Sequence, residues 1–251
     1  MRNPSAPRHT GRRRVAEADP WSLGTLGRRF PDSIPDTTLT TPAGVEITTG
    51  VLPDAGIDPG ELADWAGEDV TALADRFGAF PYATLTVPLL PDEGGGIEYP
   101  SSILLAGAGR VVLEHEVAHM WFYGMVGDSQ FRDPWLDEAF ATYAESLDDQ
   151  APQAAQDRAL AVPGDVGASM DEFDDTGTYF DVVYGKGAAA LLAARQAAGP
   201  EAFDAALRCY VQTSAWTIAT PEDLAAALAD LPAALDVLVR AGALDQADLP
   251  D

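Results

Sequence analysis

The chain has 251 residues, of which 47% are hydrophobic and 22% are charged, a composition typical of folded globular proteins. Asp and Glu number 40 against 15 Lys and Arg, which gives a formal net charge of −25 at pH 7. Such a charge repels phosphate backbones, so nucleic-acid binding is not expected. The longest apolar runs fall far short of the ~20 residues that span a bilayer. The single cysteine excludes an intrachain disulfide and any multi-cysteine metal site.

The beginning of the chain differs in composition from the rest. Residues 1–30 contain seven arginines and only two acidic residues. No apolar core of ~7–15 residues follows this basic stretch, so the pattern is not that of a secretory signal. We therefore expect residues 1–40 to form a basic, disordered tail or the remnant of a lost domain. On this interpretation the protein is cytoplasmic by default, and it is secreted only if its start has been wrongly assigned.

Short strands and one helix are predicted before residue 110. Residues 45–48 alternate between apolar and polar side chains, and residues 83–90 and 103–105 are apolar runs bounded by turn residues. Between the first two strands, Asp58 followed by a proline predicts the start of a helix, and Gly78 predicts its end.

The next predicted helix, over residues 110–126, contains the pattern His115-Glu116-Val117-Ala118-His119. Residues four apart lie on one face of a helix, so both imidazoles can reach one metal ion. Glu116 lies beside them, where it can accept a proton from water instead of binding the metal. The rest of this helix is nearly all apolar, as in a buried central helix. Two ordinary histidines on an amphipathic helix are the alternative to this metal-site prediction.

A further helix, predicted over residues 134–148, supplies a third metal ligand. A catalytic zinc ion held by two histidines needs one more protein ligand and an open position. Glu138 follows His119 by nineteen residues, and a helix that folds back on its predecessor brings its carboxylate to the histidines. We therefore expect one Zn²⁺ per chain. Glu145 lies on nearly the same helical face as Glu138, and is either a hydrogen-bond partner of a zinc-binding histidine or a solvated acid.

The remainder of the chain is predicted to be helical. After an acidic loop at residues 165–175, alanine-rich helices are expected near residues 186–198, 201–212, 221–229 and 233–241. Strands that precede a run of helices indicate the α+β class. The expected organisation after residue 40 is a strand-rich lobe with the two zinc-binding helices at residues 41–150, followed by a helical lobe at residues 151–251.

Four segments match the motifs of one enzyme family in the same order. The metal motif is followed by Trp135-Leu136-Asp137-Glu138-Ala139-Phe140-Ala141, which is similar to Trp-Leu-Asn-Glu-Gly-Phe-Ala. The segment Gly95-Gly96-Ile97-Glu98-Tyr99-Pro100 is similar to a Gly-Ala-Met-Glu-Asn exopeptidase motif in its Gly-Gly-Met-Glu-Tyr form, and Tyr184-Gly185-Lys186-Gly187 is similar to Tyr-x-Lys-Gly. Over residues 60–195 the chain therefore resembles the aminopeptidase N family of gluzincin zinc metallopeptidases.

The resemblance implies a thermolysin-like catalytic domain and assigns a role to each matched residue. His115, His119 and Glu138 are expected to bind Zn²⁺, and Glu116 is expected to be the general base. Tyr184 is expected to donate a hydrogen bond to the oxyanion of the tetrahedral intermediate.

The resemblance also implies how a peptide binds. Glu98 is expected to pair with the free α-ammonium group of the substrate, while backbone groups of Gly95 and Gly96 line the peptide like an added strand. The expected reaction is hydrolysis of a peptide bond by zinc-activated water, with removal of N-terminal residues.

Departures from the family pattern leave two other functions open. Asp137 replaces an asparagine beside the third ligand, Met120 replaces a glutamine after the second histidine, and no β-rich domain is recognised before the match. The alternatives are an endopeptidase without exopeptidase control and a truncated, catalytically silent zinc-binding protein. Metal content and turnover of an aminoacyl chromogenic substrate distinguish them.

Overall fold

The computed structural model describes residues 34–90, 94–147 and 152–250. Most of the segment that we expected to be a basic tail, residues 1–33, therefore lies outside the described residues. Its last residues do not behave as a tail, because Asp36–Thr40 forms strand β1 and pairs with the next strand. The residues from Ile34 onward form one compact unit, and their division into two lobes at residue 150 stays a prediction.

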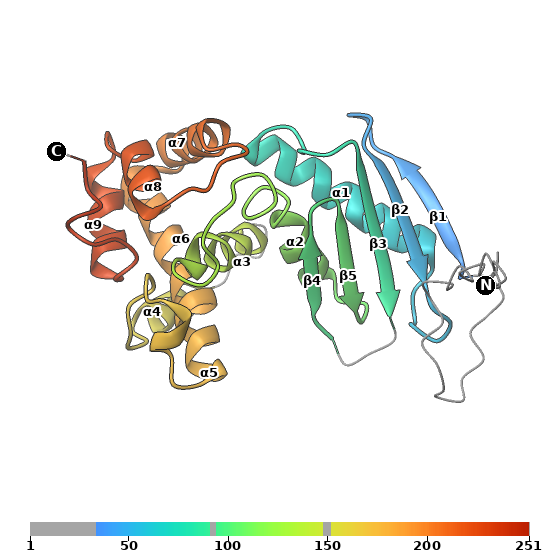
Figure 1. Cartoon of the computed structure of the whole chain (residues 1–251), viewed down its shortest axis with the longest axis horizontal. Coiled ribbons are helices and arrows are strands. Elements are labelled where there is room, and N and C mark those ends of the chain that lie inside the picture. The colour runs from blue at the N-terminus through green and yellow to red at the C-terminus, as the bar shows by residue number, and fades with distance from the viewer. Residues whose placement is uncertain (1–33, 91–93, 148–151, 251) are drawn as a thin grey trace, which may run out of the picture. The chain divides into compact units, whose positions relative to one another are not determined.

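A mixed sheet of five strands forms the first part of this unit, in the order β1-β2-β3-β5-β4 (Figure 1). β2 (Glu46–Val51), β3 (Thr84–Leu90) and β5 (Ser102–Ala106) run parallel, while β1 and β4 (Gly96–Tyr99) are antiparallel edge strands. Parallel neighbours need a crossover connection, and helix α1 (Pro59–Phe77) supplies it between β2 and β3.

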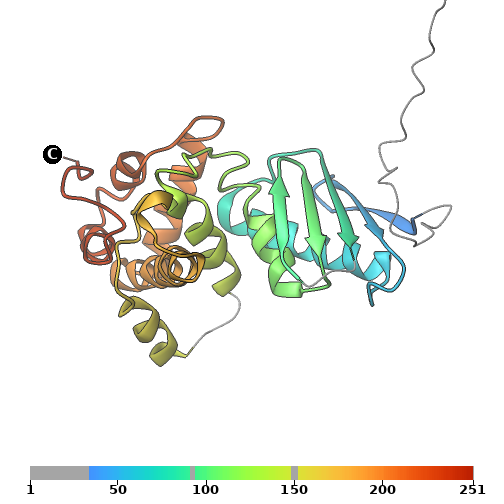
Figure 2. The same ribbon diagram turned by 60° about the horizontal axis from the view of Figure 1, so that its bottom comes forward.

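Two helices pack on one face of the sheet (Figures 1 and 2). α1 begins and ends where the sequence predicts, because the Asp58 side chain accepts a hydrogen bond from the backbone N–H of Gly60 and Gly78 adopts a φ of 108° that favours glycine. Side chains of β3 alternate between the two faces, as a half-buried strand requires. The residues of β3 that face the core are Leu85, Val87 and Leu89.

Helix α2 is shorter than predicted. It spans Arg110–Ala118, so the expected continuation to residue 126 is wrong. The chain turns sharply after His119, and Tyr123 has a φ of 94° while the N–H of Gly124 bonds back to the carbonyl of His119. Met120, Trp121 and Phe122 at this turn are apolar and fully buried, and the ring of Phe122 packs 5.0 Å from that of Phe77. An all-apolar segment gives no periodic signal to mark where its helix ends.

Helices form the rest of the unit, and strands followed by helices confirm the α+β class. The predicted helix over residues 134–148 is interrupted at Asp137, where a short 3₁₀ turn gives way to α3. α3 packs against both α2 and α6. None of the helices in the described ranges is both long and apolar enough to cross a membrane. The helical elements are η1 (Pro134–Leu136), α3 (Glu138–Ser146), α4 (Gln153–Leu160), η2 (Met170–Glu172), α5 (Thr176–Tyr179), η3 (Phe180–Lys186), α6 (Gly187–Ala198), α7 (Pro200–Thr213), α8 (Pro221–Ala227) and α9 (Pro232–Arg240).

Candidate metal centre

His115 of α2, His119 at the C-terminal cap of α2 and Glu138 of α3 converge on one point. The Oε2 atom of Glu138 lies 3.3 Å from Nε2 of His115 and 3.4 Å from Nε2 of His119. Zn–N and Zn–O bonds of ~2.0–2.1 Å at tetrahedral angles place two donor atoms about 3.3 Å apart. All three donor atoms lie within 4.8 Å of one another. The set therefore fits a zinc ion with three protein ligands, and it leaves a fourth position for water or substrate.

The other nitrogen of each imidazole also contacts a carboxylate. Nδ1 of His115 lies 3.3 Å from Oε2 of Glu145, and Nδ1 of His119 is hydrogen-bonded to Oδ1 of Asp137. Glu145 thus lies beside a histidine, as its helical spacing suggested, instead of facing solvent. Both rings are oriented with Nε2 toward Glu138, which is the arrangement that carboxylates give to metal-binding histidines.

Glu116 is buried beside this cluster with one unsatisfied oxygen. Its side chain comes from α2, as that of His115 does, and its Oε2 atom has no hydrogen-bond partner among the described residues. Burial raises the pKa of Glu116 to about 7. A carboxyl group with a pKa near neutrality can both accept and return a proton at physiological pH.

Strand β4 passes over Glu116. Gly96 begins this strand, and a Cβ atom added at Gly96 would lie only 2.5 Å from Oε1 of Glu116. Gly95 has a φ of 106°, a conformation that favours glycine. Glu98 is partly buried on the same strand, where burial raises its pKa, and a carboxylate oxygen of Glu98 lies within 4.8 Å of donor atoms of Glu116 and His119. The exopeptidase-like motif is therefore an edge strand and not a flexible loop.

Tyr184 completes the group from a π-helical turn, η3. Its ring stacks on that of His115, with centroids 5.8 Å apart and planes 5° from parallel, and it also contacts the ring of Phe180. Burial and the neighbouring charge of Glu138 raise the pKa of the Tyr184 phenol well above its ordinary value. The hydroxyl therefore stays protonated and able to donate a hydrogen bond. π-helical turns are frequent at functional sites, but the sequence gives no sign of this one.

The carboxylates and imidazoles strongly shift one another's pKa values. Burial lowers the pKa of His115, but its hydrogen bonds with Glu138 and Glu145 outweigh burial and raise the pKa to about 9. Burial opposes ionisation of Glu138, yet its hydrogen bonds with His115 and His119 hold its pKa far below the usual range. In the metal-free protein at neutral pH, protons on the histidines therefore take the place that a cation would occupy.

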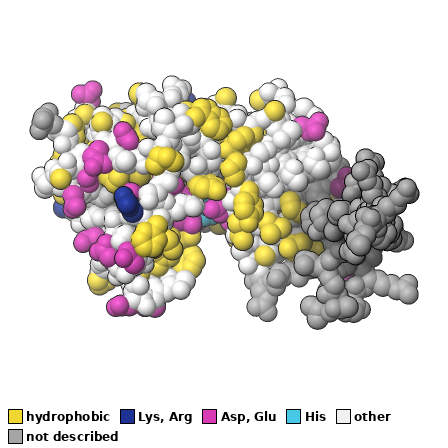
Figure 3. Space-filling model, viewed as in Figure 1, with side chains coloured by type: hydrophobic (Ala, Val, Ile, Leu, Met, Phe, Trp, Pro, Cys, Tyr) yellow, Lys and Arg dark blue, Asp and Glu magenta, His cyan; other side chains and the backbone are white. Residues whose placement is uncertain are grey.

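One cavity of about 490 Å³ brings together all nine residues that the sequence singled out. In Figure 3 a histidine side chain is visible beside acidic side chains, in the hollow near the middle of the face shown. None of the described residues that line this cavity is a lysine or an arginine. The nine residues are Gly95, Gly96, Glu98, His115, Glu116, His119, Glu138, Glu145 and Tyr184.

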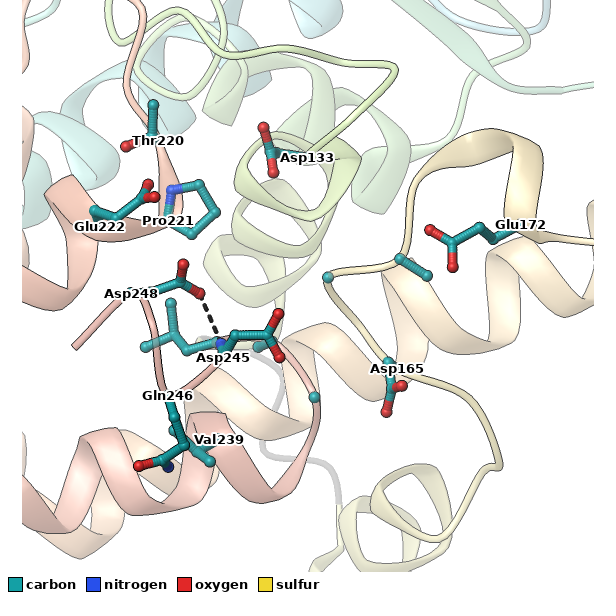
Figure 4. A pocket seen from close by; sticks show the side chains of 15 residues that line it. Asp133, Asp165, Glu172, Thr220, Pro221, Glu222, Val239, Asp245, Gln246 and Asp248 are labelled. Carbon is teal, nitrogen blue, oxygen red and sulfur yellow. Dashed lines mark hydrogen bonds between the residues drawn. The ribbon is translucent and has the colours of Figure 1, made fainter.

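A second, larger cavity lies elsewhere and contains none of these residues. It measures about 590 Å³ and is lined by six carboxylates from the helical part of the unit (Figure 4). No histidine is among its described lining residues, and no carboxylate that lines it belongs to a cluster with metal-like spacing. We therefore take the smaller cavity as the functional site. The six carboxylates are Asp133, Asp165, Glu172, Glu222, Asp245 and Asp248.

Sequence reasoning missed two residues that contact the cluster. Asp137 entered the sequence analysis only as a departure from the family pattern. Its position directly before Glu138 was the signal that its side chain could also reach the histidines. Gln130 donates a hydrogen bond from Nε2 to Oδ2 of Asp137 over 2.8 Å. This contact crosses an irregular loop, so no periodicity in the sequence points to it.

Comparison with known proteins identifies the family. A sequence model of the peptidase family M1 domain matches residues 106–240. Aminopeptidase M1-A of Oryza sativa subsp. japonica is 30% identical over 134 residues, which cover 47% of this chain and 15% of the relative. Aminopeptidase N of Streptomyces lividans is 32% identical over 133 residues, which cover 45% of this chain and 16% of the relative.

A solved structure shows the same fold. An M1 zinc metallopeptidase from Deinococcus radiodurans is 25% identical and superimposes with a TM-score of 0.66, covering 82% of this chain and 51% of that chain. This similarity confirms the fold of a zinc-peptidase catalytic domain that the motifs predicted. The chain spans less than a quarter of the length of the curated relatives that it matches.

The matched segment contains both histidines of the metal motif, Glu138 and Tyr184, and covers more than half of the chain. The chain therefore belongs to peptidase family M1, the family of its aminopeptidase N relatives.

Proposed function

We propose that this chain is the catalytic part of a zinc-dependent aminopeptidase that hydrolyses the first peptide bond of a substrate with a free N-terminus. One observation carries the proposal. Three donor atoms with the spacing of zinc ligands lie beside a buried carboxylate, Glu116, whose Oε2 atom has no partner among the described residues. The relatives, which are named aminopeptidases and zinc metallopeptidases, support the same reaction.

The proposed metal ligands are His115, His119 and Glu138, which would hold one Zn²⁺ per chain. When bound, this ion would act as a Lewis acid toward water and the substrate carbonyl. The neutral imidazoles and the carboxylate are the ligand types that catalytic zinc sites use.

Glu116 and Tyr184 are the proposed catalytic residues. Glu116 accepts a proton from the attacking water as the carbon–oxygen bond forms, and then delivers that proton to the leaving amine as the carbon–nitrogen bond breaks. Glu116 lies close to donor atoms of His119 and Glu98, which places its carboxylate beside the reacting groups for both transfers. Tyr184 remains protonated and donates a hydrogen bond to the developing oxyanion.

Strand β4 is the proposed binding edge for the peptide. It is the last strand of the sheet, and no described strand pairs with its outer edge, where an extended substrate can add. Gly95 and Gly96 lack side chains that would block this approach. Glu98 reaches the cavity from the same strand, where its carboxylate can receive the α-ammonium group of the first residue.

Metal content and two matched substrates test the proposal. The purified protein should bind one equivalent of zinc and release p-nitroaniline from leucine p-nitroanilide but not from its N-acetyl derivative. Glu116→Gln should retain zinc and lose turnover, while Glu201→Gln, a change of the same kind on the exposed surface of α7, should keep both. Zinc binding without turnover would favour a silent zinc-binding protein, and equal cleavage of an internal peptide bond would favour an endopeptidase.

A further inference from the structure

The two histidines of the cluster are held unequally. Each presents Nε2 to Glu138 and Nδ1 to a second carboxylate. At His115 that second carboxylate is Glu145, with side chains 12% and 19% exposed and a separation of 3.3 Å. At His119 it is Asp137, with both side chains 1% exposed and a short hydrogen bond between them.

The contact with Asp137 determines which nitrogen of His119 carries a proton. An ionised carboxylate only accepts hydrogen bonds, so Nδ1 of His119 must be the donor. In the neutral ring the lone pair is then on Nε2, which faces the Oε2 atom of Glu138 at 3.4 Å. Because both partners are buried, water does not compete for this bond, and the ring cannot rotate without leaving a buried carboxylate unsatisfied.

Gln130 holds Asp137 from the other side. Its Nε2 donates to Oδ2 of Asp137 over 2.8 Å, while Oδ1 accepts from His119. Asp137 lies between η1 and α3, directly before Glu138. Its two oxygens connect Gln130, in an irregular loop, to His119 at the end of α2. Glu145 has no comparable hydrogen bond from a second side chain among those that the structure describes.

We propose that Asp137, braced by Gln130, is the positioning residue that fixes His119 for metal binding, and that it matters more for metal affinity than Glu145 does. The proposal rests on the zinc site of the proposed function. It concerns residues that touch neither metal nor substrate. Loss of a carboxylate that orients a metal-binding histidine typically weakens metal affinity by about 10- to 100-fold.

Zinc affinity measured by competition with a chromophoric chelator tests this order of importance. Asp137→Ala should weaken zinc binding by about 10- to 100-fold, Glu145→Ala should weaken it less, and Gln130→Ala should weaken it by about three- to tenfold. Gln153→Ala is the matched control, because Gln153 donates a similar bond of 3.0 Å to Asp157 on exposed helix α4, away from the site. This control should bind zinc as the unaltered protein does.

Histidine NMR provides a readout that does not depend on activity. The chain has three histidines, so the Nδ1–H proton of His119 can be assigned by substitution. It should give a downfield, slowly exchanging signal in both the metal-free and the zinc-bound protein. Asp137→Ala should abolish this signal, whereas Asp137→Asn, which keeps an acceptor oxygen, should preserve it and restore part of the zinc affinity.

Two results separate the failure of this inference from that of the proposed function. If the unaltered protein binds no zinc, the proposed function is refuted, and this inference falls with it. If the unaltered protein binds zinc and a folded Asp137→Ala variant binds it equally well, only the inference is overturned. Should Asp137→Ala not fold, equal zinc affinities of Gln130→Ala and Gln153→Ala overturn the bracing role, and loss of the Nδ1–H signal in Asp137→Asn overturns the orientation of His119.

Discussion

Replacing Gly96 by alanine is the sharpest test of how β4 places the proposed general base. The added Cβ would lie 2.5–2.6 Å from Oε1, Cδ and Cγ of Glu116, whereas ordinary contacts lie at 3.4–4 Å. The carboxylate of Glu116 must therefore move by about 1 Å. Gly96 does not have a positive φ, so its backbone accommodates alanine without strain.

The expected effect falls on catalysis and not on folding or metal binding. A misplacement of about 1 Å can lower the rate by about 10²-fold, which corresponds to about 2.7 kcal/mol in activation free energy. We therefore expect Gly96→Ala to retain zinc and to show a kcat/KM about 10²-fold lower on leucine p-nitroanilide. Gly50→Ala is the control, because the new Cβ there would make only an ordinary contact of 3.6 Å with Ile34.

A double-mutant cycle ties the loss to Glu116. If Gly96→Ala acts by displacing that carboxylate, it should cost little further activity in a Glu116→Gln background, since residues that act as a unit are not additive. Full activity of Gly96→Ala would refute the steric argument. An equal loss in both backgrounds would show that Gly96 acts through something other than Glu116.

Three further predictions concern protons. Glu116→Gln should lower kcat by about 10³-fold at unchanged zinc content, measured by steady-state kinetics and metal analysis, because it removes the proton acceptor; retained turnover would contradict this role. Zinc binding at pH 7 should release protons, and zinc affinity should rise with pH up to about 9, because His115, whose pKa is about 9, must lose its proton to bind metal; calorimetry in buffers of different ionisation enthalpy measures the release, and pH-independent affinity would argue against His115 as a ligand. Asp128→Asn should stabilise the metal-free fold by about 2 kcal/mol at pH 9 and by little at pH 4. Burial, followed by the charge of Asp137, raises the pKa of Asp128 from 3.8 to about 8, and neither oxygen of Asp128 has a partner among the described residues. The neutral carboxyl group of Asp128 therefore favours the fold of the unaltered protein below pH 4, and this stability is lost as the pH rises through 8. Urea denaturation gives the difference from wild type, exposed Asp64→Asn is the control, and a pH-independent difference would contradict the prediction.

The parts of the site that the sequence could predict are those set by local geometry. Two histidines four residues apart must share a helical face, and the boundaries of α1 follow from an aspartate cap and a terminal glycine. The closeness of Glu138 to the two histidines was predicted because a helix that follows a connection of this length can fold back on its predecessor. Each of these inferences depends on the geometry of a short segment of chain, which is the same whatever the rest of the fold is.

The parts that the sequence could not predict depend on tertiary contacts. The end of α2 at Ala118 is set by where buried aromatic rings such as Phe122 find space, and apolar residues fit many such positions. β4 was not among the predicted strands, and its pairing with β5 makes it one. The π-helical turn that carries Tyr184 and the bond from Gln130 to Asp137 likewise have no local pattern.

The acidity of the chain, which is only a bias of composition in the sequence, has a specific consequence at the site. Five carboxylates surround two imidazoles, and no lysine or arginine lines the described part of the cavity. These carboxylates have to be balanced by positive charge, because unpaired buried charges are costly. In the metal-free protein the balance comes from protons on the histidines, which is why the pKa of His115 rises to about 9. A divalent cation would supply the same charge while leaving both rings neutral and able to bind it. The arrangement that makes the histidines basic is thus also the one that favours a metal ion over protons as the pH rises.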